Sequence, residues 1–293
     1  EHLARYLRVQ YFSMLDAPMS QSRNFTLNSI LNMYGVEWPE EEPLVEAAVL
    51  RKVGTDYNTP LSIRSTIRAA RENARVLRHV ISTELWESIN AFHLEAQGLD
   101  PDFFATHGLY EFTVKVGEHC AIIRSRVDDT LLQDEAWSLL KLGIHLERVV
   151  QVIRILNSKL YDIDVMTDRG ANRALRQYQG TVILKILEGF DMHRQAYRQL
   201  LTPQTMVEFL VGHPHFSRSI TYNMNAVRKL LARMDHDTTE RNPVSFQAGK
   251  LYNYFHYLEY ADIADDVGGQ LDRALQRVYN LHDAISQKYF QLS

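Results

Sequence analysis

The chain has a single cysteine, Cys120, among its 293 residues, so it cannot form an internal disulfide. Nothing in it therefore points to an oxidising compartment, and the cytoplasm is the expected location. Glycine and proline are also scarce, with 13 and 8 residues, which leaves few turn signals for a fold of many strands. Because 293 residues can bury a large core, these absences favour one large all-α protein.

Long apolar runs and an excess of basic charge are absent too. The most apolar stretch, Val149 to Leu156, is interrupted by Gln151 and Arg154, so we expect no membrane-spanning helix and no membrane partner. The formal net charge is -4, which disfavours a nucleic-acid partner. We expect no signal peptide, since the first residues of the sequence do not have the pattern of one. The first residues, Glu1 to Arg8, are already amphipathic, and we expect the first helix to begin upstream of them.

Helical periodicity, in contrast, runs along most of the chain. We expect the first helix to stop near Asp16, and Ser62 to cap a helix that runs to about Phe92. The break expected between Gly108 and Gly117 precedes another helix, and Asp128-Asp129-Thr130 can cap the next. Further helices are expected at residues 28–34, 44–53, 118–132, 135–159, 171–201, 203–210, 217–235 and 246–289, the last with a break near residues 268–269.

An arginine stripe borders the apolar face of the helix that Ser62 caps. Its members follow helical spacings of four and three and lie about 100° from the apolar stripe; they are Arg64, Arg68, Arg71, Arg75 and Arg78. One interpretation is a solvated rim whose aliphatic stems cover the core edge. The other is a face that binds anions or pairs with acids.

The predicted helix 135–159 is apolar on opposite sides, which is typical of a helix buried among others. Glu147 and Arg154 are seven residues apart on it and should project to nearly the same side. Charges in such a place require partners, so we expect Glu147 to bind an internal partner.

Three segments place Glu beside Arg on amphipathic helices: Glu1-His-Leu-Ala-Arg5, Arg71-Glu-Asn-Ala-Arg75 and Leu146-Glu-Arg148. With them, the strings at 61–75, 82–90, 134–137, 142–148 and 216–220 and the tail around His282 and Tyr289 resemble the bacterial alpha-E domain over essentially the whole chain. The resemblance implies an all-α, multi-helix bundle of long antiparallel helices without a significant sheet. We expect a single domain over 1–293, with two lobes that could meet near 160–170.

The resemblance also implies partners, because alpha-E proteins occur beside or fused to ATP-grasp ligase-like and transglutaminase-like proteins. It supplies no catalytic residues, and no intrinsic activity is identifiable. The residues expected in a polar core or in contact with an anionic or peptide ligand are Glu1, Arg5, Arg68, Glu72, Arg75, Glu147, Arg148, Arg154 and Arg218. Whether this Glu/Arg core is structural or functional stays open at this point.

These features are compatible with two functions. The first is a helical accessory or binding protein that works with those partners in peptide synthesis or modification. The alternative is an all-helical enzyme that acts on a peptide or a phosphorylated substrate through the Glu/Arg core.

Other patterns give weaker signals, and we expect neither a metal nor a cofactor. Asp262, Asp265 and Asp266 share a helical face that we interpret as solvated. His213 and His215 form only a pair in a loop. Cys120 follows His119 directly, but adjacent helical residues point about 100° apart and form a poor nucleophile–base pair.

Overall fold

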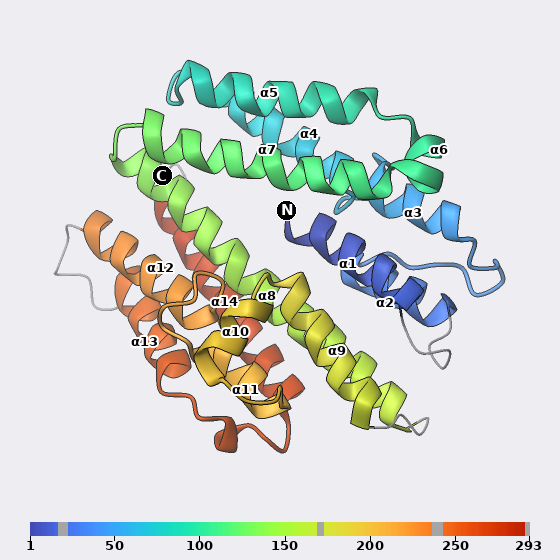
Figure 1. Ribbon diagram of the computed structural model, residues 1–293. Coiled ribbons are helices and arrows are strands. Elements are labelled where there is room, and N and C mark those ends of the chain that lie inside the picture. The colour runs from blue at the N-terminus through green and yellow to red at the C-terminus, as the bar shows by residue number, and fades with distance from the viewer. Residues whose placement is uncertain (17–22, 169–172, 236–242, 291–293) are drawn as a thin grey trace. The chain divides into compact units, whose positions relative to one another are not determined.

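The computed structural model describes residues 1–16, 23–168, 173–235 and 243–290, and Figure 1 shows that most of these are helical. They contain no strand, and the predicted all-α bundle is confirmed. The chain divides into two compact units, Glu1–Gln133 and Asp134–Ser293. The sequence suggests a boundary near 160–170, but α8 (Glu135–Asp168) continues without a break across residues 160–168, and the division comes before it.

In unit 1 two pairs of consecutive helices are joined by α7. The helix α1 packs on α2, α4 packs on α5, and α7 packs on both α5 and α1. Tyr6 and Tyr34 lie in this core, where their hydroxyls bond Ser29 Oγ (2.7 Å) and the Leu3 carbonyl (2.9 Å). The elements are α1 (His2–Asp16), α2 (Arg23–Tyr34), α3 (Glu46–Gly54), α4 (Ile63–Val76), α5 (Thr83–Gly98), α6 (Pro101–Phe103), the π-helix η1 (Phe104–Gly108) and α7 (Leu109–Thr130).

Serine hydroxyls set the ends of the α4–α5 hairpin. Ser62 begins α4 as predicted, since its Oγ accepts the Ser65 amide at 3.1 Å. The expected continuous helix to Phe92 is wrong, because α4 ends at Val76 and Ser82 starts a second helix by accepting the Leu85 amide at 3.1 Å. A turn at 77–82 therefore folds α5 back along α4.

The region after α5 is more continuous than the sequence predicts. The break expected between Gly108 and Gly117 is absent, because η1 leads directly into α7. Asp134 caps α8, with its Oδ1 3.0 Å from the Trp137 amide, so the cap comes later than the predicted Asp128-Asp129-Thr130.

In unit 2 the long helix α8 packs against α9, α12 and α14. Val149, Ile153 and Ile155 are all fully buried, as expected for a helix apolar on more than one side. The other elements are α9 (Arg173–Ile186), α10 (Phe190–Tyr197), α11 (Pro203–Val207), the π-helix η2 (Glu208–Gly212), α12 (Ile220–Met234), α13 (Val244–His256), the 3-10 helix η3 (Tyr260–Asp262) and α14 (Val267–Tyr289).

Two predicted helices of unit 2 are interrupted. The one expected at 171–201 breaks between α9 and α10, where Glu188 has φ 52°, and its residues 171–172 lie outside the described residues. The one expected at 246–289 breaks at 257–266, before the Gly268-Gly269 pair. Asp266 caps α14 there by accepting the Gly269 amide at 2.9 Å.

Asp235 joins the three C-terminal helices at the end of α12. Its Oδ1 accepts hydrogen bonds from Lys288 Nζ (2.8 Å) and the Tyr289 hydroxyl (2.7 Å) of α14. Its Oδ2 accepts the Ser245 amide (3.0 Å) at the start of α13. These bonds lower the pKa of Asp235 to about 2 although burial opposes ionisation, and its side chain is only 5% exposed.

Candidate functional site

The first predicted Glu/Arg pair forms part of a small ion cluster in unit 1. The Glu1 carboxylate accepts one hydrogen bond from Arg5, one turn along α1, and another from Arg124 of α7. Glu1 and Arg5 are almost buried, with side chains 12% and 6% exposed. The cluster therefore joins the start of α1 to α7, and Arg124 is a member that the sequence patterns did not indicate.

The second pair lies on the surface, which corrects the expectation of a polar core there. Glu72 binds Arg71 Nη1 at 2.5 Å and Arg75 Nε at 2.8 Å, yet its side chain is 44% exposed and that of Arg75 is 59% exposed. Arg68 is also exposed and lies over the Tyr57 ring. These residues belong to the solvent-facing side of α4.

Arg64, the first member of the arginine stripe, differs from the others because it is buried. Its Nε donates to the Ala96 carbonyl at 3.0 Å, and its Nη2 donates to the Leu99 carbonyl. Because the last carbonyls of a helix have no partner within the helix, Arg64 caps the C-terminal end of α5.

Glu147, which was expected to bind an internal partner, forms no ion pair with Arg154 among the described residues. Glu147 is exposed, and its Oε1 accepts from Gln151 Nε2 at 2.6 Å. Arg148 and Arg154 are half-buried on the same helix. Arg218 pairs with Glu188, so it belongs to a different cluster of unit 2. Within each unit, the candidate residues therefore belong to separate clusters.

A buried pair that the patterns did not indicate lies further along α8. Lys159 is fully buried, and its Nζ donates to Asp162 Oδ2 at 2.8 Å. Burial lowers the pKa of Lys159, and the Asp162 carboxylate opposes that change. The spacing of three residues on an apolar helix was the available signal.

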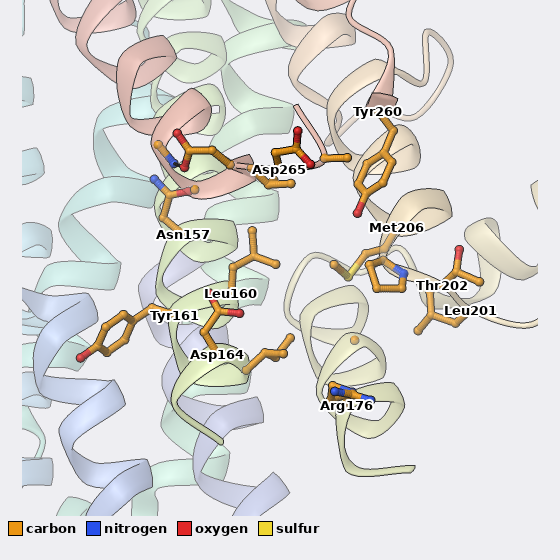
Figure 2. A pocket seen from close by; sticks show the side chains of 18 of the residues that line it. Asn157, Leu160, Tyr161, Asp164, Arg176, Leu201, Thr202, Met206, Tyr260 and Asp265 are labelled. Carbon is orange, nitrogen blue, oxygen red and sulfur yellow. Dashed lines mark hydrogen bonds between the residues drawn. The ribbon is translucent and has the colours of Figure 1, made fainter. Parts of the chain in front are cut away.

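Unit 2 contains a large pocket between α8, α9, the segment that leads into α11, and the start of α14. Its volume is about 890 Å³, within the size range of small-molecule sites. Leu160, Leu201 and Met206 give it an apolar lining (Figure 2). The polar residues around it are Asn157, Tyr161, Asp164, Arg176, Gln177, Thr202, Tyr260, Asp265, Asp266 and Asp272.

Some charged side chains of this pocket are hydrogen-bonded within the protein, and others are not. Asp272 accepts from Asn157 Nδ2 at 2.5 Å, and Asp266 binds the Gly269 amide and Arg273. Among the described residues, however, Asp164, Asp265 and Arg176 form no hydrogen bond or ion pair. They lie well apart around the pocket in Figure 2, with Asp265 at one end and Arg176 at the other.

The acidic face expected from Asp262, Asp265 and Asp266 is broken up by the chain's path. Asp262 is in η3, where its Oδ2 accepts the Glu259 amide at 3.1 Å, while Asp266 caps α14. No three His, Cys, Asp or Glu side chains gather into a metal-binding group within the residues that the structure describes. His213 and His215 instead bond locally, with the His215 amide donating to His213 Nδ1 at 3.3 Å.

His119 is engaged away from Cys120. Its Nε2 lies 2.7 Å from Glu95 Oε2 of α5, and its ring stacks on Phe92 with centroids 4.5 Å apart. The pKa of Glu95 is lowered by its hydrogen bonds to His119 and Lys115. His119 of α7 is therefore bonded to the neighbouring helix α5.

Within the described part of the chain, no helix has the length and apolar character needed to cross a membrane. A family model for Alpha-E, described as a predicted alpha-helical domain with a conserved ER motif, matches residues 1–290. No curated protein and no solved structure matches the chain.

Proposed function

Since the chain belongs to the Alpha-E family of helical proteins, we propose that it is a peptide-binding accessory protein with its binding site in the unit 2 pocket. In this proposal it works in the bacterial cytoplasm with ATP-grasp ligase-like and transglutaminase-like proteins, in a system that makes or modifies peptides. The pocket would receive the peptide on which those partners act.

The observation that carries the proposal is the set of opposite, unpaired charges around one pocket. Asp265 can accept hydrogen bonds from an amino group at one end of the pocket, and Arg176 can bind a carboxylate through two parallel hydrogen bonds at the other. A short peptide carries both groups at opposite ends, and apolar side chains would meet Leu160, Leu201 and Met206.

The enzyme alternative has less support. An active site built on the Glu/Arg core would need those residues around one pocket, but none of the nine lines the unit 2 pocket. A phosphorylated substrate would also meet more carboxylates than guanidinium groups there, because Asp164, Asp265, Asp266 and Asp272 face a single Arg176.

The test is calorimetric titration of the full chain with trialanine and with two blocked forms, N-acetyl-trialanine and trialanine amide. We expect each block to weaken binding by roughly tenfold, because each removes one charge-assisted contact. Equal binding of all three peptides, or no binding of any, would contradict the proposal.

Variants then assign the two ends. Arg176→Gln should remove the preference for a free carboxylate while keeping the preference for a free amine, and Asp265→Asn should do the reverse. Arg194→Gln is the matched control, because Arg194 is an exposed arginine of unit 2 that contacts Phe190 outside the pocket.

The partner part of the proposal is tested separately. The purified chain is mixed with an ATP-grasp ligase-like protein and with a transglutaminase-like protein from the same genome, and each mixture is analysed by size-exclusion chromatography. Co-elution with at least one supports the accessory role, and separate elution from both contradicts it.

A further inference from the structure

A second surface, on unit 1, carries mostly positive charge. Four arginines follow one side of α4 and the turn after it, and the helix α5 packs beside them. We call this surface the arginine face; it consists of Arg68, Arg71, Arg75 and Arg78 together with Tyr57, Trp86 and His93.

Aromatic rings hold three of the four guanidinium groups. Arg68 Cζ lies 4.6 Å from the centroid of Tyr57, while Arg71 and Arg78 lie 5.6 and 5.4 Å from that of Trp86. Arg71 also donates to Asn90 Oδ1 at 3.2 Å. Stacked guanidinium groups lose less conformational freedom on binding, so the face is partly organised for an anion.

The charges of this face are not balanced within it. One carboxylate, Glu72, faces four guanidinium groups, and its hydrogen bonds to Arg75 and Arg71 lower its pKa. The pKa of His93 is lowered by burial and then by the charge of Arg71. The lowered pKa of Glu72 has the sign that a positive local potential produces, and the charge of Arg71 adds the same effect to the larger effect of burial on His93.

We propose that the arginine face binds an acidic segment of a partner protein. Arg68 and Arg75 are seven residues apart on α4, which is about 10 Å along the helix, and Arg78 follows in the turn after it. An extended chain covers the α4 part with about three residues and continues toward Arg78 with the next. A segment with three or four Asp or Glu residues in such a stretch would match the number and spacing of the guanidinium groups.

Two observations favour a protein over a nucleic acid. The Trp86 ring, the surface on which a base would stack, is already occupied by Arg71 and Arg78. Exposed apolar side chains adjoin the arginines, with Val76, Leu77 and Val80 exposed by 65%, 43% and 44%. Arginine beside apolar surface is typical of protein interfaces.

The test measures fluorescence anisotropy of a labelled pentaglutamate peptide titrated with the full chain, next to a pentaglutamine peptide and a labelled oligothymidine of five nucleotides. We expect pentaglutamate to bind at low salt, to weaken as the salt concentration rises, and to bind more tightly than either other probe. Stronger binding of the oligothymidine, or no preference for pentaglutamate over pentaglutamine, overturns the proposal.

Paired variants locate the binding. Arg75→Gln/Arg78→Gln should weaken pentaglutamate binding about fivefold, as expected for two exposed ion pairs. Arg51→Gln/Arg126→Gln removes the same charge from exposed positions of unit 1 outside the face and should change the affinity less than twofold. Equal losses in both variants would show that net charge alone attracts the peptide and would refute the assignment. Thermal unfolding of both variants confirms that the fold is retained.

Discussion

Replacing Asp235 with Asn tests whether one carboxylate holds together the three C-terminal helices. Its pKa of about 2 lies nearly two pH units below the ordinary value of 3.8, and this difference corresponds to about 2 kcal/mol of stability. The side chain is almost buried, so little of this is lost to screening by water. Asn keeps an acceptor for the Ser245 amide but loses the charge that binds Lys288 and Tyr289.

The pH dependence has a definite sign. Since folding lowers the pKa of Asp235, its contribution is complete above about pH 4, declines as the pH falls below that value, and is mostly lost at pH 2. The stability difference between the original chain and Asp235→Asn should therefore be about 2 kcal/mol at pH 7 and a few tenths at pH 2.

Urea unfolding followed by tryptophan fluorescence measures this difference. Two of the three tryptophans, Trp38 and Trp86, are in unit 1, so a background with Phe at both leaves Trp137 to report on unit 2. The midpoint at pH 7 should fall by roughly 1 M urea. Asp283→Asn, an exposed change on α14, is the control and should leave the midpoint unchanged. An Asp235→Asn midpoint equal to that of the original chain at pH 7 would refute the reasoning.

Two further substitutions separate buried from exposed charges. Arg64→Ala should cost about 1–3 kcal/mol in a chemical denaturation experiment, because it leaves the carbonyls of Ala96 and Leu99 without their donor; a loss as small as that of exposed Arg75→Ala would argue against the capping role. Glu147→Ala should change the melting temperature by less than about 2 °C, since the exposed carboxylate binds only Gln151 among the described residues, and a fall of several degrees would show that it has a structural role.

Helix positions were predictable where a polar cap and an apolar stripe occur together. Ser62 starts α4 as expected, and Ser219 starts α12 two residues after the expected start at 217, because each hydroxyl accepts an amide three residues ahead. Breaks inside long periodic stretches were not predictable. The turn at 77–82 and the turn at Glu188 carry no Pro and continue an apolar pattern that suits a helix equally well.

The residues of the candidate site were harder to predict from the sequence than the helices. Periodicity shows which side of a helix a charge is on, but it cannot show what faces that side. Glu147 therefore appeared to need a buried partner, and the structure leaves it exposed. The unit 2 pocket combines Asp164, Arg176 and Asp265, and the first and last of these are about 100 residues apart in the sequence. Helical periodicity relates only residues on one helix, so it could not bring them together.

The turn between α4 and α5 also has a kinetic consequence. Arg78 and Trp86 are eight residues apart and in contact, and Arg71, seven residues before Arg78, reaches the same ring. Contacts between residues so near in sequence form quickly, because little chain entropy is lost in closing a short loop. This hairpin should therefore be among the first parts of unit 1 to assemble, and the arginine face should be complete before the Glu1–Arg124 pair joins the two ends of that unit.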